Sequence, residues 1–199
     1  MLLSVIFLVS FSTLAFEVLL TRVFSIGQWN HLSFMVISIA LFGFGASGAF
    51  LSMIDARCHR CRTLLVSEPA LAALACLYTV AAVLSFLVLN NLPLDYFRLP
   101  VEPVQSLYLL TAFLFLSLPF FIAGTIIALG YTAQPQKTGL IYFASMAGSA
   151  LGAIAPAVLL PLFGEGRLLV VMPLIPILPV VSNALMPSFG KNSNARHLY

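Results

Sequence analysis

The feature that most constrains this chain is a series of long apolar runs separated by short polar connections. A helix needs about 20 apolar residues to cross the hydrocarbon core of a bilayer. About six runs meet that length, and their approximate bounds are Leu2–Leu20, His31–Met53, Pro69–Leu89, Ser106–Ala133, Leu140–Phe163 and Leu168–Met186. The runs are continuously apolar and do not alternate as the strands of a transmembrane barrel would. We therefore predict an all-α polytopic transmembrane bundle of about six helices.

Composition supports the bilayer as the solvent. Only 8% of the residues are charged and 61% are hydrophobic, whereas a soluble domain carries roughly 25% charged residues. No basic patch typical of nucleic-acid binding is present, and no basic segment precedes the first run as it would in a cleavable signal peptide. We expect one membrane domain over residues 1–187, followed by a short polar cytoplasmic tail over 188–199.

Orientation follows from the Lys and Arg residues in the connections, because cytoplasmic loops carry an excess of them. One side holds six of the nine cations, namely Arg57, Arg60, Arg62, Lys137, Lys191 and Arg196, and the other side holds Arg22, Arg98 and Arg167. This bias predicts that both termini face the cytoplasm.

Small residues predict where helices pack closely. Ala144, Gly148 and Gly152 recur every four residues in the fifth run and form a flat strip on one helix face. Such strips let helix backbones approach each other in lipid. The second run ends in a similar cluster with Gly43, Gly45 and Gly48, and we expect it to supply the matching surface. Both helices should then be buried in the bundle.

The same cluster spells GxGxxG, but it lies within an apolar span and does not open a helix after a strand. A dinucleotide site needs that strand–turn–helix context, so we interpret these glycines as packing residues.

Prolines interrupt two of the predicted helices. The sixth run contains Pro173, Pro176 and Pro179, and the fourth contains Pro119. Proline removes a backbone donor and bends a helix, so the sixth helix should be irregular. Broken helices line substrate sites in some transporters, although a proline kink without such a role is the commoner case in membrane helices.

Three ionisable residues, Glu17, Arg22 and His31, lie at or near the turn between the first two runs. Charges within a span are costly and often functional. We therefore consider a polar cluster that handles a cation or a proton, with Glu17 accepting a positive group and His31 titrating near neutral pH. The alternative is an interfacial ion pair that only fixes the first hairpin.

Cys58 and Cys61 form a CxxC with His59 between them, in a loop expected on the cytoplasmic side. A structural zinc site needs four ligands, so we interpret this loop as a basic connection with incidental thiols and predict no metal. No pairing of residues predicts a catalytic site, and no cofactor is expected.

Four segments resemble bacterial spermidine synthase-like proteins with an N-terminal membrane region. Phe16–Arg22 (FEVLLTR) with the Gly-rich second run resembles the start of that region, and Leu118–Gly124 (LPFFIAG) resembles its LPFFxxG helix. The stretch from Gly139 and Tyr142 through Gly148 and Gly152 resembles its G-x-x-Y helix with two later glycines. In that family an aminopropyltransferase domain follows the membrane helices. Residues 191–199 carry none of its motifs, so none of its catalytic residues can be assigned to a position of this sequence.

The resemblance implies a non-catalytic, multi-pass module of the cell inner membrane that binds or passes a small cationic solute such as a polyamine. Its expected partners are the lipid bilayer, a cytoplasmic synthase-like domain or subunit, and further copies of the chain in a homo-oligomer. Two alternatives stay open, an independent small transporter or permease and a structural membrane anchor for a soluble enzyme.

Overall fold

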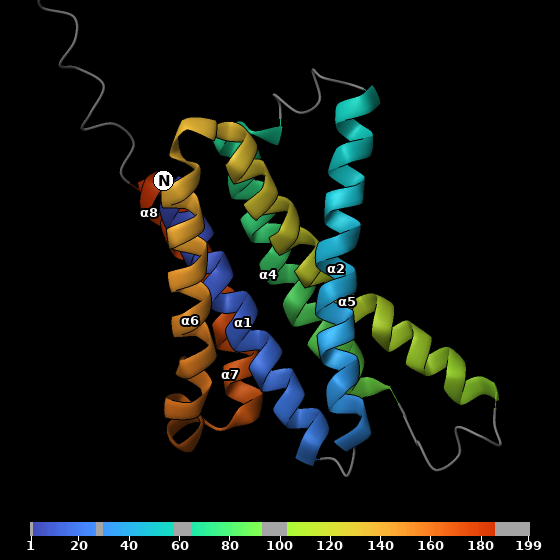
Figure 1. The fold of residues 1–199 in the computed structure, drawn as a ribbon. Coiled ribbons are helices and arrows are strands. Elements are labelled where there is room, and N and C mark those ends of the chain that lie inside the picture. The colour runs from blue at the N-terminus through green and yellow to red at the C-terminus, as the bar shows by residue number, and fades with distance from the viewer. Residues whose placement is uncertain (1, 27–29, 58–64, 93–102, 186–199) are drawn as a thin grey trace, which may run out of the picture.

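The computed structural model describes residues 2–26, 30–57, 65–92 and 103–185, with only the backbone described at 26, 30–33 and 183–185. Every regular element within these ranges is helical (Figure 1). In chain order they are α1 (Leu2–Ile26), α2 (Asn30–Arg57), α4 (Glu68–Asn91), α5 (Pro103–Ala133), the short 3₁₀ helix η2 (Pro135–Lys137), α6 (Thr138–Phe163), α7 (Glu165–Val171), the 3₁₀ helix η3 (Met172–Ile177) and α8 (Leu178–Leu185).

Six stretches are long and apolar enough to cross a membrane, which confirms the predicted all-α bundle of about six spans. Five of them correspond to α1, α2, α4, α5 and α6, and the sixth, Glu165–Ser182, combines α7, η3 and part of α8. At 31 residues, α5 is longer than a perpendicular span needs, and it runs diagonally across the bundle (Figure 1). Tilt of this kind accommodates a long apolar helix in a bilayer of ordinary thickness.

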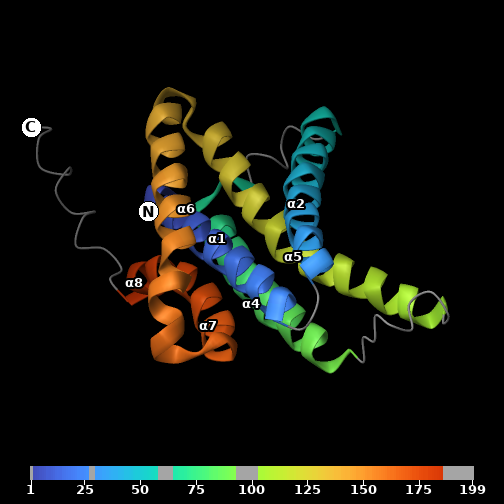
Figure 2. The same ribbon diagram turned by 60° about the horizontal axis from the view of Figure 1, so that its bottom comes forward.

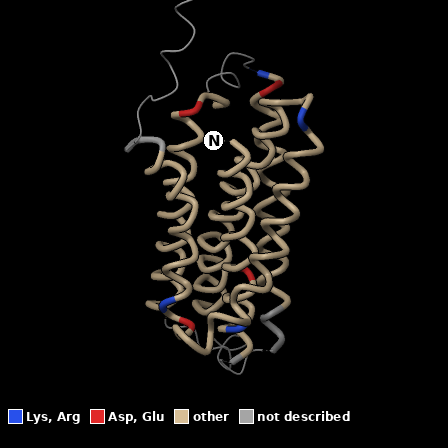
Figure 3. Tube along the Cα trace, turned by 90° about the vertical axis from the view of Figure 1, so that its left-hand side faces the viewer, with Lys and Arg blue, Asp and Glu red and all other residues tan. Residues whose placement is uncertain are grey.

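The charged residues gather toward the two ends of the bundle, and the band between them is mostly uncharged (Figure 3). Helix α1 starts at the same end at which α2, α5 and α8 finish (Figure 1). The predicted cytoplasmic location of both termini requires this arrangement. Which end faces the cytoplasm stays a prediction, and the tail over 188–199 lies outside the described residues.

Helix α1 lies at the centre of the packing. It contacts α6, α2, η3 and α5, and Phe16, Leu19 and Leu20 on it are fully buried. The Phe16 ring meets Phe120 of α5, with 6.2 Å between the ring centroids. Half of the α1 span is buried within the protein, against 17% of the span that contains α6. The first apolar run, α1, therefore forms part of the core of the bundle and does not lie at its edge.

The small-residue strip of α6 faces α1, which corrects the partner that the sequence suggested. A Cβ atom added to Gly148 or Gly152 would collide with the backbone carbonyl of Phe7 or Phe11, respectively. Ala144, on the same strip, is half-buried. Helices α2 and α6 lie on opposite sides of α1 (Figures 1 and 2), so their small surfaces cannot meet.

Helix α2 packs chiefly against α5, through Gly43. A Cβ there would lie 2.6 Å from the Phe120 Cβ and 2.8 Å from the Ser117 carbonyl oxygen. Gly45 and Gly48 have no heavy atom within 4 Å of an added Cβ, so neither has a packing partner within the described chain. The expectation that α2 and α6 are buried was also wrong, because 28% and 17% of their spans are buried and both helices form the edge of the bundle.

The sixth crossing is irregular, as its prolines predict. It changes from α-helix to 3₁₀-helix at Met172 and back to α-helix at Leu178. By contrast, α5 continues through Pro119, and α6 continues through Pro156 and Pro161. Among the described crossings, the one with three closely spaced prolines is the one that leaves the α-helical path.

The contact between α6 and α1 can be tested by adding one methyl group. Gly152→Ala should lower the free energy of unfolding by about 1–3 kcal/mol, because the new Cβ forces the α1 backbone away. Gly45→Ala is the matched control, since its Cβ enters open space and Ala favours a helix over Gly by up to about 1 kcal/mol. Reversible unfolding in bicelles or mixed micelles measures both, and equal effects at the two positions would contradict the packing described.

Candidate functional site

Glu17 lies on α1 within the first membrane span and is half-buried. At a rise of about 1.5 Å per residue, it lies roughly 7.5 Å deeper along the helix than Arg22. The Glu17 carbonyl accepts a hydrogen bond of 2.9 Å from the Thr21 hydroxyl. Its carboxyl group has no hydrogen bond or ion pair with any residue in the described part of the chain. Glu17 is therefore an acidic side chain at membrane depth without a cation from the described residues to balance it.

Arg22 does not join Glu17, although the sequence suggested a shared polar cluster. Its Nε donates a hydrogen bond of 3.1 Å to Oε1 of Glu165 on α7, so the two side chains form a salt bridge. Five residues along a helix correspond to about 140° of rotation, so Arg22 and Glu17 leave α1 in different directions. This salt bridge links the last turns of α1 to the first residue of α7, where the sixth crossing begins. The Glu17 carboxyl group is left without a partner among the described residues.

The remaining predicted polar residues cannot be placed. His31 belongs to α2 by its backbone, but its side chain lies outside the described residues, as do Cys58, His59 and Cys61. Among the residues that are described, no three His, Cys, Asp or Glu side chains gather in a way that could hold a metal ion.

Hydroxyl groups continue the polar face of α1 toward the middle of the bundle. Ser10, Thr13, Glu17 and Thr21 recur every three or four residues and so share one helix face. Ser10 lies 3.1 Å from the Ser145 hydroxyl of α6, and Thr13 donates to the Val9 carbonyl at 2.7 Å. Ser10 and Thr13 are both about 1% exposed, whereas Glu17 and Thr21 are partly open. The face thus grows more polar and more accessible toward the Arg22 end.

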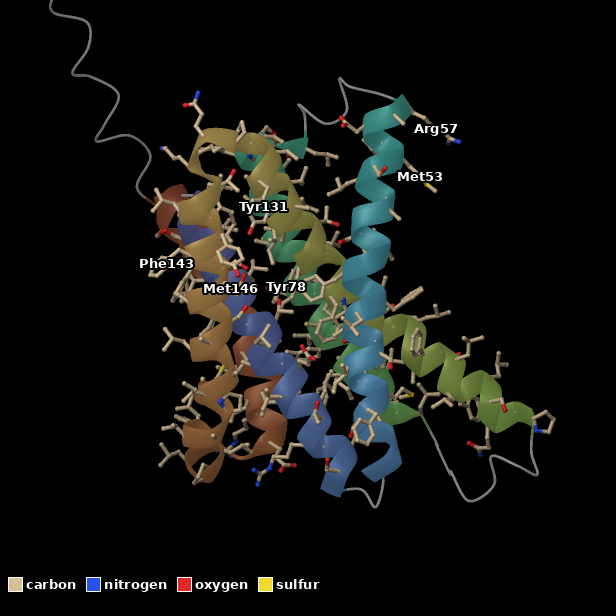
Figure 4. All side chains as sticks on the ribbon, in the orientation of Figure 1. Met53, Arg57, Tyr78, Tyr131, Phe143 and Met146 are labelled. Carbon is tan, nitrogen blue, oxygen red and sulfur yellow. The ribbon has the colours of Figure 1, made fainter. Side chains whose placement is uncertain are left out.

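A second polar cluster, which the sequence did not reveal, joins α1 and α4 to the sixth crossing. Ser12 donates to the Met172 carbonyl at 2.8 Å, and the Tyr78 hydroxyl lies 2.9 Å from the Ser12 hydroxyl. Thr79 donates to the Pro173 carbonyl at 2.6 Å. Tyr78 is completely buried and points into the bundle, whereas Met53 and Phe143 point outward (Figure 4).

Pro176 explains why the Pro173 carbonyl needs a side-chain donor. In the 3₁₀-helical η3 that carbonyl would accept a hydrogen bond from the N–H of residue 176, whereas the Met172 carbonyl would accept one from the N–H of Ile175. Proline has no N–H, and a bilayer offers no water to replace it. The Thr79 hydroxyl supplies the missing donor to the Pro173 carbonyl, and the Ser12 hydroxyl donates to the neighbouring Met172 carbonyl. We call Ser12, Tyr78, Thr79 and the carbonyls of Met172 and Pro173 the oxygen cluster.

The two sites differ in chemistry. Glu17 offers a carboxylate that can accept a proton or a positively charged group. The oxygen cluster is formed by neutral hydroxyl and carbonyl groups. Among the described residues, neither site places a nucleophile beside a base.

Comparisons of the chain with known protein families, with curated proteins and with solved structures gave no match. The resemblance to spermidine synthase-like membrane proteins therefore remains a prediction based on the four sequence segments described above.

The link between α4 and the sixth crossing predicts a measurable loss on Thr79→Val, which removes the hydroxyl at nearly constant shape. The free energy of unfolding should fall by about 1–2 kcal/mol because the Pro173 carbonyl loses its donor in an apolar surrounding. Thr111→Val is the control, since Thr111 bonds to Leu107 of its own helix near the surface. Similar losses in the two variants would show that the bond to Pro173 has no special weight.

Proposed function

We propose that this chain is a non-catalytic, multi-pass membrane module that binds a small organic cation at Glu17. One observation carries the proposal: a carboxyl group within a span has no cationic partner in the described chain. A charge at that depth is expensive unless it is paired, and acidic residues inside spans usually mark ion or substrate sites. An organic ammonium group would supply the missing charge.

The surroundings of Glu17 suit such a ligand. The nearest arginine along the helix, Arg22, is already engaged by Glu165 and does not compete for the carboxyl group. The hydroxyls of Thr13 and Thr21 lie on the same face of α1, and their oxygen atoms can accept hydrogen bonds from an ammonium group. Glu17 is partly exposed, so a ligand can reach its carboxyl group.

The family resemblance names the first cations to test, which are polyamines. It also suggests the inner membrane as the location and a cytoplasmic synthase-like domain or subunit as a partner. In this proposal the module would hold or deliver the amine, and any chemistry would occur on the partner.

Transport is the second candidate function, and the broken sixth crossing favours it. Discontinuous helices beside a polar site occur in secondary transporters, where they permit movement around the bound substrate. Here η3 packs against α1, the helix that carries Glu17. A module that only anchors a partner would not need a charged group at this depth.

Binding of radiolabelled spermidine to the protein in nanodiscs tests the proposal. Wild type should bind saturably, and Glu17→Gln should weaken binding at least tenfold because the ion pair is lost (about 1.4 kcal/mol per factor of ten). Glu68→Gln is the control, since Glu68 is exposed on α4 at the opposite end of the bundle. No saturable binding by wild type, or equal binding by Glu17→Gln, would refute a cation site at Glu17.

Uptake into proteoliposomes separates the two candidate functions. Accumulation of spermidine that depends on Glu17 would identify a transporter, whereas binding without uptake would identify a binding module.

A further inference from the structure

The oxygen cluster has features beyond those needed to repair a helix break. It draws on three segments, α1, α4 and the sixth crossing, that meet at one level of the bundle. Its side-chain members Ser12, Tyr78 and Thr79 are each at most 4% exposed. Its members are consecutive along two of the segments, Tyr78 with Thr79 and Met172 with Pro173, so the hydroxyl-to-carbonyl bonds lie close together.

Each of the two hydroxyl donors has a second partner to which its proton can turn. The Thr79 hydroxyl lies 2.6 Å from the Pro173 carbonyl and also 3.2 Å from the Ala75 carbonyl of its own helix. The Ser12 hydroxyl lies 2.8 Å from the Met172 carbonyl and 2.9 Å from the Tyr78 hydroxyl, where either oxygen can donate. Turning both protons would release the two carbonyls and expose lone pairs on Ser12 and Thr79.

We propose that the oxygen cluster binds an alkali cation, with Na⁺ as the natural probe. The ligands would be the carbonyl oxygens of Met172 and Pro173 and the hydroxyl oxygens of Ser12 and Thr79. Carbonyls freed by an interrupted membrane helix are known ligands for Na⁺. The members of the cluster include no carboxylate, and Ca²⁺ and Mg²⁺ sites depend on carboxylates, so a monovalent ion fits the donor set better. The bound ion would tie α1 and α4 to the sixth crossing.

Thermal unfolding of the purified protein at constant ionic strength tests this proposal, with NaCl or KCl compared against choline chloride. One alkali chloride should raise the unfolding midpoint in a saturable way. The shift should be about 3–6 °C when the cation is about tenfold above its dissociation constant. Binding of ²²Na⁺ to wild type, displaced by unlabelled alkali cations and not by choline, checks the result without any substitution.

Variants locate the ion. Ser12→Ala and Thr79→Val should lose the cation-dependent shift, whereas Thr111→Val should keep it because Thr111 lies outside the cluster. If both cluster variants fail to fold, Tyr78→Phe, which keeps the ring, should reduce the shift.

Two results would overturn the proposal. One is an identical wild-type midpoint in alkali and choline salts together with no displaceable ²²Na⁺, which would mean that the cluster is a structural clamp only. The other is a full shift in Thr79→Val. Glu17→Gln should retain the shift, and its loss there would place the ion at Glu17 and contradict a site at the cluster. These outcomes are independent of spermidine binding, so this proposal and the proposed function can fail separately.

Discussion

Backbone pairing in an apolar medium is the constraint on which this structure depends. A helix that crosses a bilayer must satisfy its carbonyl groups without help from water. The sixth crossing lacks one such donor, because Pro176 has no N–H to give to the Pro173 carbonyl in the 3₁₀-helical segment. Thr79 of α4 donates to that carbonyl, and Ser12 of α1 donates to the neighbouring Met172 carbonyl. Pro176, which interrupts the α-helix, therefore also leaves the Pro173 carbonyl free to bond to Thr79 of α4.

Helix α1 connects nearly every element of this account. It buries Phe16 and Leu20 in the core, accepts the glycine strip of α6 against its backbone, and sends Ser12 to the sixth crossing. Its remaining face carries Glu17. Because Phe16 and Leu20 hold α1 in the core on either side of Glu17, packing sets the depth and direction of the Glu17 side chain.

Much of the fold could be predicted from apolar run length, because a span needs a fixed number of apolar residues. The irregular sixth crossing followed from its prolines for an equally local reason. The partners could not be predicted in the same way. Small residues occur on several helices, and nothing in the spacing of Gly148 and Gly152 tells whether α1 or α2 will lie against them. Gly45 and Gly48 show that a small residue need not face a neighbour.

The candidate site was predictable only in part, for a related physical reason. Glu17 stands out as a charge in an apolar run, whereas its relation to Arg22 depends on Glu165, which lies 143 residues from Arg22 along the chain. Ser12 and Thr79 are ordinary hydroxyl residues whose partners are backbone carbonyls 160 and 94 residues away.

The most direct test of their role is a double-mutant cycle between Thr79→Val and Pro176→Ala, read as the free energy of unfolding. The Pro176→Ala substitution would restore a backbone donor at that position. Thr79→Val should therefore cost at least about 0.5 kcal/mol less in that background, whereas costs that add within about 0.3 kcal/mol would contradict the account.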